Sequence, residues 1–329
     1  MPFTTARSLS LAAPVLALLG ACDPALDATD DAGPAEFRDC PSCVLNSPVL
    51  NDFLFPELHL GGLPNFDGVT LIGIYKPNVP APYTLDVSFD EELVARSGAT
   101  VIARAGALIN WEIELEKGGT RMRGRIVGHT RTIPSWAAGN RAISAYAIAF
   151  QSPTVPGLFI NACPSFANNA TATVLTIIPG QTYDRELKLV DITDDPEWVT
   201  FACADEAAYK AKRLGYDPNI RFAGTNQPAS VAQQNATLKM ITADYCGTGH
   251  SFTAQGTELW WQNDAATVTT QPDADSLVEA VWTDAGALCL DTPRHVERLQ
   301  VEAACDIPYC GGLDLTNSSG EWMTWAPAP

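Results

Sequence analysis

The two-residue turn at Gly118-Gly119 constrains this chain more than any other short segment does. Two glycines between alternating strands are typical of a β-hairpin. When the flanking residues are aligned outward from this turn, three pairs of opposite charges face one another, and each pair stabilises an antiparallel ladder by about 0.2–1 kcal/mol. The turn and the charges therefore predict the same register for a hairpin over residues 110–127. The charge pairs are Glu116 with Arg121, Glu114 with Arg123, and Glu112 with Arg125.

The two faces of this hairpin differ in polarity. Alternation along a strand places the charge pairs on one face, which we expect to lie in water, and apolar residues on the other. Because each arginine already has an acidic neighbour, solvated ion pairs are a better interpretation of the charged face than an anion site. The apolar face, which we expect to pack into a core, consists of Trp111, Ile113, Leu115, Met122 and Ile126.

Further segments ahead of the middle of the chain have the composition of strands. Residues 69–75 are rich in β-branched residues, and residues 83–90 alternate between apolar and polar side chains, with Phe89 on the apolar face. Residues 173–178 form another β-branched run that ends at a Pro-Gly turn. We expect residues 181–192, which follow this turn, to be its partner strand.

Two helices are predicted in the middle of the chain. Residues 204–214 are rich in Ala and Lys and are followed by Gly215, a residue type that commonly ends a helix. Ser230 is a predicted N-cap for a second helix that continues to Tyr245. Apolar residues at helical spacing support this second helix.

Strands return after the second helix. Residues 251–260 are predicted to form a hairpin around Gln255-Gly256, with Phe252 opposite Leu259. Residues 279–290 are predicted to form another, whose three-residue loop ends in a glycine.

These elements predict a fold that is mainly β with some α (α+β). Residues 48–195 are expected to form a β-rich, sandwich-like domain, and residues 196–329 a smaller α+β domain linked by disulfides. The chain has 329 residues, of which 46% are hydrophobic, so it can bury sizeable cores and does not have the composition of a disordered protein.

The chain is strongly acidic. Its net charge is −18, from 38 acidic and 20 basic residues. A surface of this charge repels phosphate backbones, so we expect no nucleic acid among its partners. It also repels an anionic bilayer surface, so attachment to a membrane would need another source of affinity.

The N-terminal residues predict export. Arg7 precedes a short apolar stretch from Leu9 to Leu19, which is too short to cross a bilayer and is followed by small residues. The Leu-Gly-Ala-Cys sequence that ends at Cys22 resembles the lipobox of bacterial lipoproteins, in which the cysteine becomes a lipid-carrying N-terminus. On that resemblance the signal peptide at residues 1–21 is removed, and Cys22 anchors the protein to a membrane facing the periplasm or the cell surface.

One alternative to a lipoprotein signal and one further prediction concern this N-terminal region. An ordinary signal peptide with an unmodified Cys22 would also fit the small residues before the cut. Residues 22–47 are acidic and rich in Ala, Pro and Gly, so we expect a solvated tether between the anchor and the first domain.

Eight cysteines remain beyond Cys22, and an even number in an exported chain favours disulfides. The pairing stays open at this point. Cys40 and Cys43 form a C-x-x-C motif, for which redox chemistry, or zinc binding together with Cys305 and Cys310, are alternatives. Because exported cysteines usually oxidise, we expect disulfides and no metal. The candidates are Cys40, Cys43, Cys163, Cys203, Cys246, Cys289, Cys305 and Cys310.

The tetrapeptide Ala-Asp-Tyr-Cys at residues 243–246 begins a glycine-containing segment that ends at Ser251. It resembles the signature of the ADYC-domain proteins, a bacterial family found largely in myxobacteria and named after this tetrapeptide. Residues 212–218 and 286–294 resemble two further segments of the family, so the resemblance extends over about residues 200–312. It implies an exported, cysteine-bearing domain of uncharacterised activity.

His250 is the strongest catalytic candidate among the four histidines. An acid–base pair would use Asp244 to orient the imidazole, with Ser251 or a water as the reacting group. The same segment also fits a disulfide-pinned turn in which Asp244 accepts backbone N–H groups and His250 lies at the surface. We favour this second interpretation, since no nucleophile elbow, dinucleotide fingerprint or two-histidine metal spacing accompanies the segment.

Together these features favour a lipid-anchored cell-envelope protein that acts as a non-catalytic binding or structural module. We expect no cofactor. The expected partners are the membrane, reached through a lipid at Cys22, and an envelope protein or polysaccharide. The alternative is an exported hydrolase that uses His250 with Asp244 or Ser251.

Overall fold

The computed structural model describes residues 47–163, 174–191, 194–204, 206–222, 227–254 and 257–328. The predicted signal peptide, Cys22, Cys40 and Cys43 lie outside these residues. Within them the fold is mainly β with few helices, as predicted, and the neighbouring strands pair antiparallel. No helix in this part of the chain is both long enough and apolar enough to cross a membrane.

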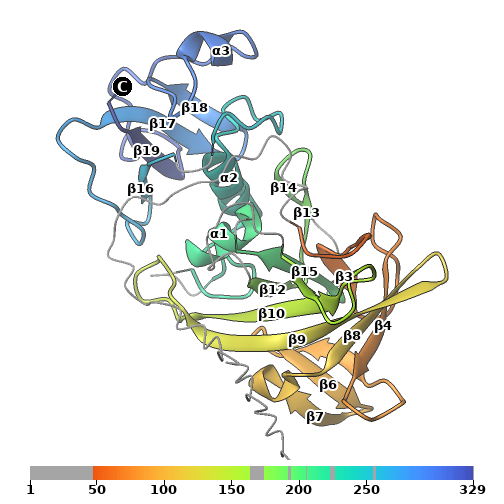
Figure 1. Cartoon of the computed structure of the whole chain (residues 1–329). Helices are drawn as coiled ribbons and strands as arrows, with labels where there is room; N and C mark the ends of the chain where they lie inside the picture. The colour runs from red at the N-terminus through yellow and green to blue at the C-terminus, as the bar shows by residue number, and fades with distance from the viewer. Residues whose placement is uncertain are drawn as a thin grey trace, which may run out of the picture.

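A curled, eight-stranded sheet shaped like half of a barrel fills the lower part of Figure 1. Its strand order is β3-β15-β12-β10-β9-β8-β4, and β11 pairs with β10. The strands are β3 (Glu57–His59), β4 (Thr70–Tyr75), β8 (Glu112–Lys117), β9 (Thr120–Ile133), β10 (Ile143–Gln151), β11 (Phe159–Asn161), β12 (Leu175–Pro179) and β15 (Trp198–Cys203).

A three-stranded sheet packs against the curled sheet and encloses the first hydrophobic core with it. This core takes apolar side chains from both sheets and from the 3-10 helix that follows the smaller one. A disulfide between Cys163 and Cys203 lies in the same core. The smaller elements are β5 (Thr84–Val87), β6 (Leu93–Ser97), β7 (Thr100–Arg104), η2 (Ala105–Leu108), and the pair β1 (Val49–Leu50) and β2 (Phe53–Leu54).

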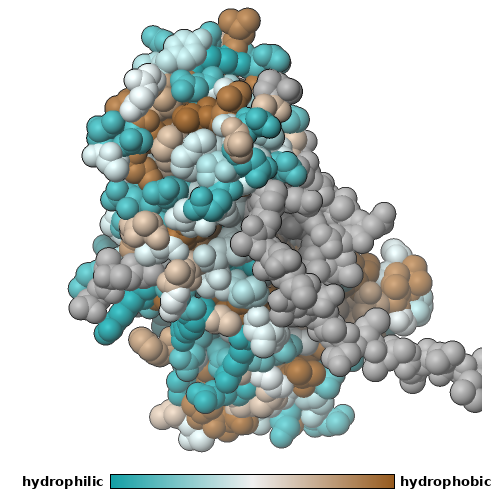
Figure 2. Space-filling model, turned by 90° about the vertical axis from the view of Figure 1, so that its left-hand side faces the viewer, coloured by the Kyte–Doolittle hydropathy of each residue, from teal (hydrophilic) through white to brown (hydrophobic). Residues whose placement is uncertain are grey.

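A four-stranded sheet in the order β16-β19-β17-β18 lies toward the C-terminal end, with helix α2 packed on it (Figure 1). A second hydrophobic core lies between this sheet and the helices. Hydrophobic and hydrophilic residues are interspersed on the face seen in Figure 2. The elements are β16 (Trp260–Asn263), β17 (Leu277–Thr283), β18 (Gly286–Leu290), β19 (Trp322–Ala326), α1 (Ala207–Arg213), α2 (Val231–Thr242) and α3 (Arg298–Glu302).

The local predictions with two independent signals are confirmed. The β8–β9 hairpin has the predicted register, with all three Glu–Arg pairs directly opposed. Helix α2 begins after Ser230, whose hydroxyl accepts from the Gln233 amide while the Gln233 side chain accepts from the Ser230 amide. This capping box fixes the first turn of the helix. Helix α1 ends before Gly215, which has a φ of +88°.

The prediction that the charged face of the β8–β9 hairpin lies in water is wrong at Glu114, which is only 4% exposed. Strand β4 pairs with β8 and brings Tyr75 beside it, and the Tyr75 hydroxyl donates to Glu114 Oε2 at 2.9 Å. The guanidinium of Arg123 stacks on the Tyr75 ring at 3.9 Å and donates to Glu114 Oε1 at 2.8 Å. A neighbouring strand, which the hairpin sequence does not reveal, therefore covers this carboxylate.

The predicted pairing of residues 173–178 with residues 181–192 is also wrong. Strand β12 pairs with β15, whereas residues 181–192 supply β13 (Thr182–Asp184) and β14 (Leu189–Asp191), which pair with each other. The reason is a turn between them, in which Lys188 has a φ of +57° and the Asp184 carboxylate accepts from the Leu187 amide at 2.7 Å. This small hairpin becomes part of the candidate site below.

Three predictions near strand ends also need correction. Residues 251–254 form no strand, and the strand that begins at Trp260 pairs with β19 instead. The β17–β18 hairpin is present, but Thr283 pairs with Gly286, so its loop has two residues and not three. The irregularity in the pairing of the two strands lies between Val281 and Trp282. Strand β5 ends at Val87, which leaves Phe89 91% exposed.

Candidate functional site

The Ala-Asp-Tyr-Cys tetrapeptide lies at the C-terminal end of α2, where the chain leaves the helix. Ala243 has a left-handed backbone, with a φ of +49°, which ends the helix after Thr242. The prediction that the helix continues to Tyr245 is therefore wrong. Cys246 follows and forms a disulfide with Cys305, which ties this end of the helix to the residues after α3. We refer to residues 243–251 as the signature turn.

Asp244 is completely buried and organises the signature turn. Its Oδ2 atom lies 2.6 Å from Lys239 Nζ and accepts from the Gly249 amide at 2.7 Å, while its Oδ1 atom accepts from the Thr248 amide at 3.0 Å. Lys239 is also buried and donates to the carbonyl oxygens of Leu187 and Gly247. Both charges are thus paired and hydrogen-bonded, which a buried ion pair requires.

Two glycines let the signature turn approach its neighbours closely. A Cβ on Gly249, whose φ is +86°, would lie 1.7 Å from the Glu186 carbonyl oxygen. A Cβ on Gly247 would lie 1.9 Å from the Ala285 carbonyl oxygen in the β17–β18 loop. Lys188 Nζ donates to the Gly249 carbonyl at 2.8 Å. The signature turn therefore supports the β13–β14 turn on one side and the four-stranded sheet on the other.

Tyr245 extends the buried polar network into the second core. Its hydroxyl donates to Glu279 Oε1 at 2.5 Å, and Arg294 binds the same carboxylate through Nε at 2.6 Å and Nη2 at 3.0 Å. Burial and the adjacent carboxylate raise the pKa of Tyr245 well above its usual value. The tyrosine ring stacks on Trp282 at 5.1 Å. These contacts position three distant segments against one another.

The structure does not join His250, Asp244 and Ser251 into an acid–base group. His250 is exposed, and its ring packs edge-on against Phe252 at 4.5 Å. The Asp244 carboxylate is engaged by Lys239 and by backbone amides, as described above. Ser251 Oγ is buried without a hydrogen-bond partner. Within the described residues, no hydrogen bond links the three side chains.

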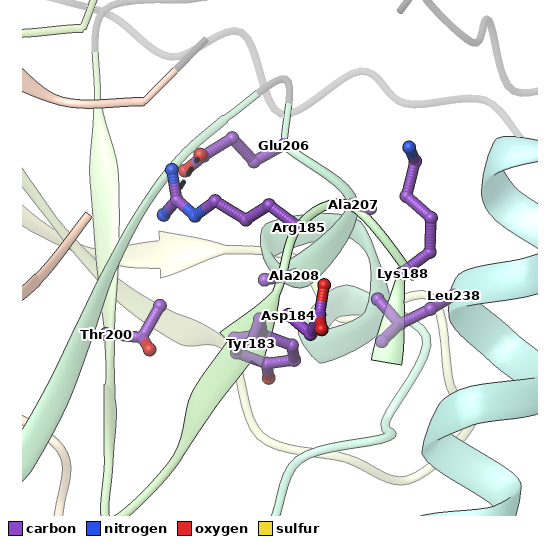
Figure 3. A pocket seen from close by; sticks show the side chains of 9 residues that line it. All are labelled: Tyr183, Asp184, Arg185, Lys188, Thr200, Glu206, Ala207, Ala208 and Leu238. Carbon is purple, nitrogen blue, oxygen red and sulfur yellow. Dashed lines mark ion pairs between the residues drawn. The ribbon is translucent and has the colours of Figure 1, made fainter. Parts of the chain in front are cut away.

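The turn that the signature supports forms part of a cavity of about 50 Å³. We call it the Arg185 cavity. Figure 3 shows Arg185 and Glu206 pointing toward each other on one side of it, with Leu238 of α2 at another. It is lined by Tyr183, Asp184, Arg185, Lys188, Thr200, Glu206, Ala207, Ala208 and Leu238.

Two carboxylates of the described residues form long ion pairs with Arg185. Its Nη2 atom lies 3.7 Å from Glu57 Oε2 and 3.9 Å from Glu206 Oε1, and its Nη1 atom donates to the hydroxyl of Ser47. The Ser47 hydroxyl in turn donates to Glu206 Oε1 at 2.9 Å. Burial raises the pKa of Glu57 to about 7, which the positive charge of Arg185 only partly offsets. Burial also lowers the pKa of Lys188.

Sequence reasoning missed this cavity for two reasons. Its lining residues come from β13, the β13–β14 turn, β15, α1 and α2, which are far apart along the chain. The only local signal was the run from Tyr183 to Lys188, and this was interpreted as part of a strand. Recognising its turn would have indicated that Arg185 and Lys188 lie at a loop and not in a ladder.

A second histidine cluster lies on the curled sheet but lacks the geometry of a catalytic triad. His129 Nε2 lies 2.9 Å from Ser144 Oγ and 3.7 Å from Glu92 Oε1. A triad uses opposite ring nitrogens for the hydroxyl and the carboxylate, whereas here one nitrogen faces both. Glu92 is also bound by Arg131 through both carboxylate oxygens. Burial lowers the pKa of His129.

Among the described residues, six cysteines form three disulfides, Cys163–Cys203, Cys246–Cys305 and Cys289–Cys310. The zinc alternative that included Cys305 and Cys310 is therefore wrong, because both sulfur atoms are already bonded. Disulfides form and persist in oxidising compartments, so the three indicate an extracytoplasmic location.

Comparison with known protein families matches residues 105–296, more than half of the chain, to the ADYC domain. The match includes the signature turn, the Arg185 cavity and most of the curled sheet. It also extends across residue 195, where the sequence analysis placed a domain boundary, and that boundary stays a prediction. No curated protein and no solved structure matches the chain.

Proposed function

The chain belongs to the ADYC-domain family, and we propose that it is a lipid-anchored, non-catalytic binding module of a bacterial cell envelope, with the Arg185 cavity as its recognition site. The observation that carries this proposal is the size and lining of the cavity. Its volume of about 50 Å³ is far below the roughly 300–1,000 Å³ of pockets that enclose small molecules. A cavity of this size accepts the end of a side chain or of a polymer, and the rest of the partner stays outside.

The lining of the cavity suits such an end group. Arg185 offers a guanidinium whose two carboxylate partners lie at the long end of the ion-pair range, at 3.7 and 3.9 Å, and Ala207, Ala208 and Leu238 add an apolar wall. A carboxylate or another small polar group of a partner could bind the arginine in two-pronged fashion. Small polar groups of this kind occur in envelope proteins and in polysaccharides.

The predicted tether supports the same arrangement. Ser47, the last residue of that segment, is buried, and its hydroxyl contacts Glu206 at the cavity. The chain thus enters the folded region beside the cavity. A lipid at Cys22 would be separated from this point by about 25 residues, which reach at most roughly 85 Å when extended.

Binding can be tested with a variant that fills the cavity. The native protein, with its disulfides formed, is sedimented with isolated cell-envelope fractions of its host and with purified envelope polysaccharide. Ala208→Leu places a good helix-forming side chain at the cavity wall, and we expect it to abolish saturable binding. Leu299→Ala, at a site that is 76% exposed, is the control. Equal binding by Ala208→Leu and the control would remove the cavity from the proposal.

The anchor is tested separately by intact mass and by fractionation. We expect the native protein to carry a lipid adduct at Cys22 and to sediment with membranes, and Cys22→Ser to be released into the soluble fraction. A native protein without lipid at Cys22 would support the ordinary signal peptide instead. The hydrolase alternative is tested with His250→Ala, which would have to abolish a measurable activity without lowering Tm.

A further inference from the structure

A second group of polar residues lies at the edge of the curled sheet, where β3 and β15 pair. His59 ends β3 and lies opposite Trp198, the first residue of β15. The loop that leads into β15 contributes Asp195 and Glu197. His59 Nε2 lies 2.8 Å from Asp195 Oδ2 and 3.7 Å from Glu197 Oε2. One ligand atom from each of the three residues falls within 4.8 Å of the other two.

We propose that His59, Asp195 and Glu197 form a binding site for a divalent transition-metal ion, with Zn²⁺ as the best fit. Zinc binds imidazole nitrogen and carboxylate oxygen at about 2.0–2.2 Å, which separates neighbouring ligands of a tetrahedral ion by about 3.3 Å. The two measured separations lie on either side of this value. A chemistry of one imidazole and two carboxylates suits zinc better than calcium, which takes oxygen ligands.

The three side chains are held in place by contacts outside the group. Asp195 Oδ1 accepts from the Glu197 amide at 3.0 Å, which leaves Oδ2 directed at the histidine. The His59 side chain is 5% exposed, and its ring packs edge-on against Trp198 at 5.0 Å. Secondary contacts of this kind orient metal ligands in proteins.

Gly61 supplies an independent observation. A Cβ at this position would lie 2.3 Å from Glu197 Oε2 and 2.9 Å from His59 Cε1. The φ of Gly61 is not in the left-handed region, so the backbone itself does not demand glycine there. A side chain at Gly61 would therefore displace the Glu197 carboxylate or the His59 ring from the positions that bring them together.

Metal binding at Nε2 needs the ring proton on Nδ1. The Leu63 amide nitrogen is 3.4 Å from Nδ1, which is long for a hydrogen bond, so its loss costs little. The ion takes the place of the proton that Nε2 shares with Asp195. Glu57, two residues earlier on the same face of β3, faces Arg185 instead and is not part of the group.

The test is a calorimetric titration of Zn²⁺ alone into the native, disulfide-bonded protein. We expect saturable binding at one site, and a loss of at least about tenfold in affinity for Glu197→Gln, whose side chain is 57% exposed and whose substitution should leave the fold intact. Asp195→Asn should weaken binding similarly. Asp194→Asn is the matched control, because it removes the same charge one residue away from the group and should leave the affinity unchanged.

Two outcomes would overturn the proposal. One is the absence of saturable zinc binding. The other is equal affinity for Glu197→Gln, Asp195→Asn, Asp194→Asn and the native chain, which would place the zinc elsewhere. A Ca²⁺ titration completes the comparison: calcium that binds as tightly as zinc and responds to the same substitutions would indicate a general acidic site without a role for the imidazole.

Discussion

The signature turn and the Arg185 cavity lie side by side, but they differ in how closely their charged side chains are paired. At the signature turn, Asp244 and Lys239 of α2 are both buried and lie 2.6 Å apart, and both form further hydrogen bonds with backbone groups. At the cavity, Arg185 is 3.7 Å or more from both carboxylates beside it. A buried charged side chain whose hydrogen bonds are all satisfied stabilises one conformation. Charged side chains with longer ion pairs at a cavity remain able to bind another molecule.

The difference shows that the polar side chains of a family signature can be engaged in structural contacts. The polar groups of the signature turn form hydrogen bonds that hold three segments together. One of these segments is the β13–β14 turn, which carries Arg185. The sequence motif thus marks the support of the proposed recognition site and not the site itself. The experiments below test this division, from the largest expected effect to the smallest.

Removal of the Asp244 carboxylate should have the largest effect. Asp244→Ala leaves the buried Lys239 ammonium unpaired and should lower the free energy of unfolding by about 3–5 kcal/mol. Urea denaturation of the oxidised protein measures the change. The exposed Asp284→Ala is the control and should change little. If Asp244→Ala does not fold, Asp244→Asn, which keeps one acceptor for the amides, should be less severe. A loss equal to that of the control would contradict the structural role.

The close approach of the signature turn to its neighbour is tested at glycine. Gly249→Ala would place a Cβ 1.7 Å from the Glu186 carbonyl oxygen in a left-handed backbone, so we expect a loss of about 2–4 kcal/mol. Gly118→Ala is a matched control, because its φ is also positive, at +57°, but no atom lies within 4 Å of the added carbon. The difference between the two variants isolates the packing contribution from the backbone strain. No difference would mean that the two turns do not depend on each other.

The free energy of unfolding should depend on pH through Glu57, which lies beside Arg185 of the cavity. Its pKa is raised by burial from 4.5 to about 7, so the folded protein binds a proton that the unfolded chain has released between these values. Glu57 therefore favours folding fully below pH 4.5, and this contribution is lost as the pH rises to 7, by up to roughly 3 kcal/mol. We expect the stability difference between the native protein and Glu57→Gln to fall across this range, as measured by denaturation at fixed pH steps. A constant difference would show that Glu57 is charged in both states.

Substitution at an exposed ion pair should give the smallest loss in the free energy of unfolding. Arg121 is 54% exposed, lies 2.9 Å from Glu116 Oε2 and makes a longer contact of 3.4 Å with Glu114, which Arg123 and Tyr75 also bind, so Arg121→Ala should cost about 1 kcal/mol or less, and less still at high salt. Denaturation at low and high ionic strength measures both effects. A loss comparable to that of Asp244→Ala would mean that burial does not explain the contrast between the regions.

Several elements could be predicted because their signals are local. The β8–β9 register follows from a two-glycine turn and three facing charge pairs, and the start of α2 follows from a cap at Ser230. The residues that carry these signals are neighbours in the chain or directly opposed across a tight turn. Their energies favour the same local structure in whatever fold contains them.

Two of the failed predictions involve partners that are distant in sequence. Residues 181–192 have the composition of a strand, but β15 takes the place beside β12, and the partner of the strand at Trp260 lies at the C-terminal end of the chain. Local composition indicates that a segment forms a strand. Which strand it pairs with depends on the hydrophobic core that the two paired strands bury.

The sequence by itself determined the mainly β character, the hairpin register, the start of α2, the end of α1 and, through its signature, the family of the chain. Only the tertiary structure decided which polar residues would be buried and paired, and which would surround an opening. The physical reason is that the pKa of Glu57, the pairing of Asp244 and the freedom of Arg185 depend on desolvation and on charges supplied by remote segments. These quantities exist only once the chain has folded.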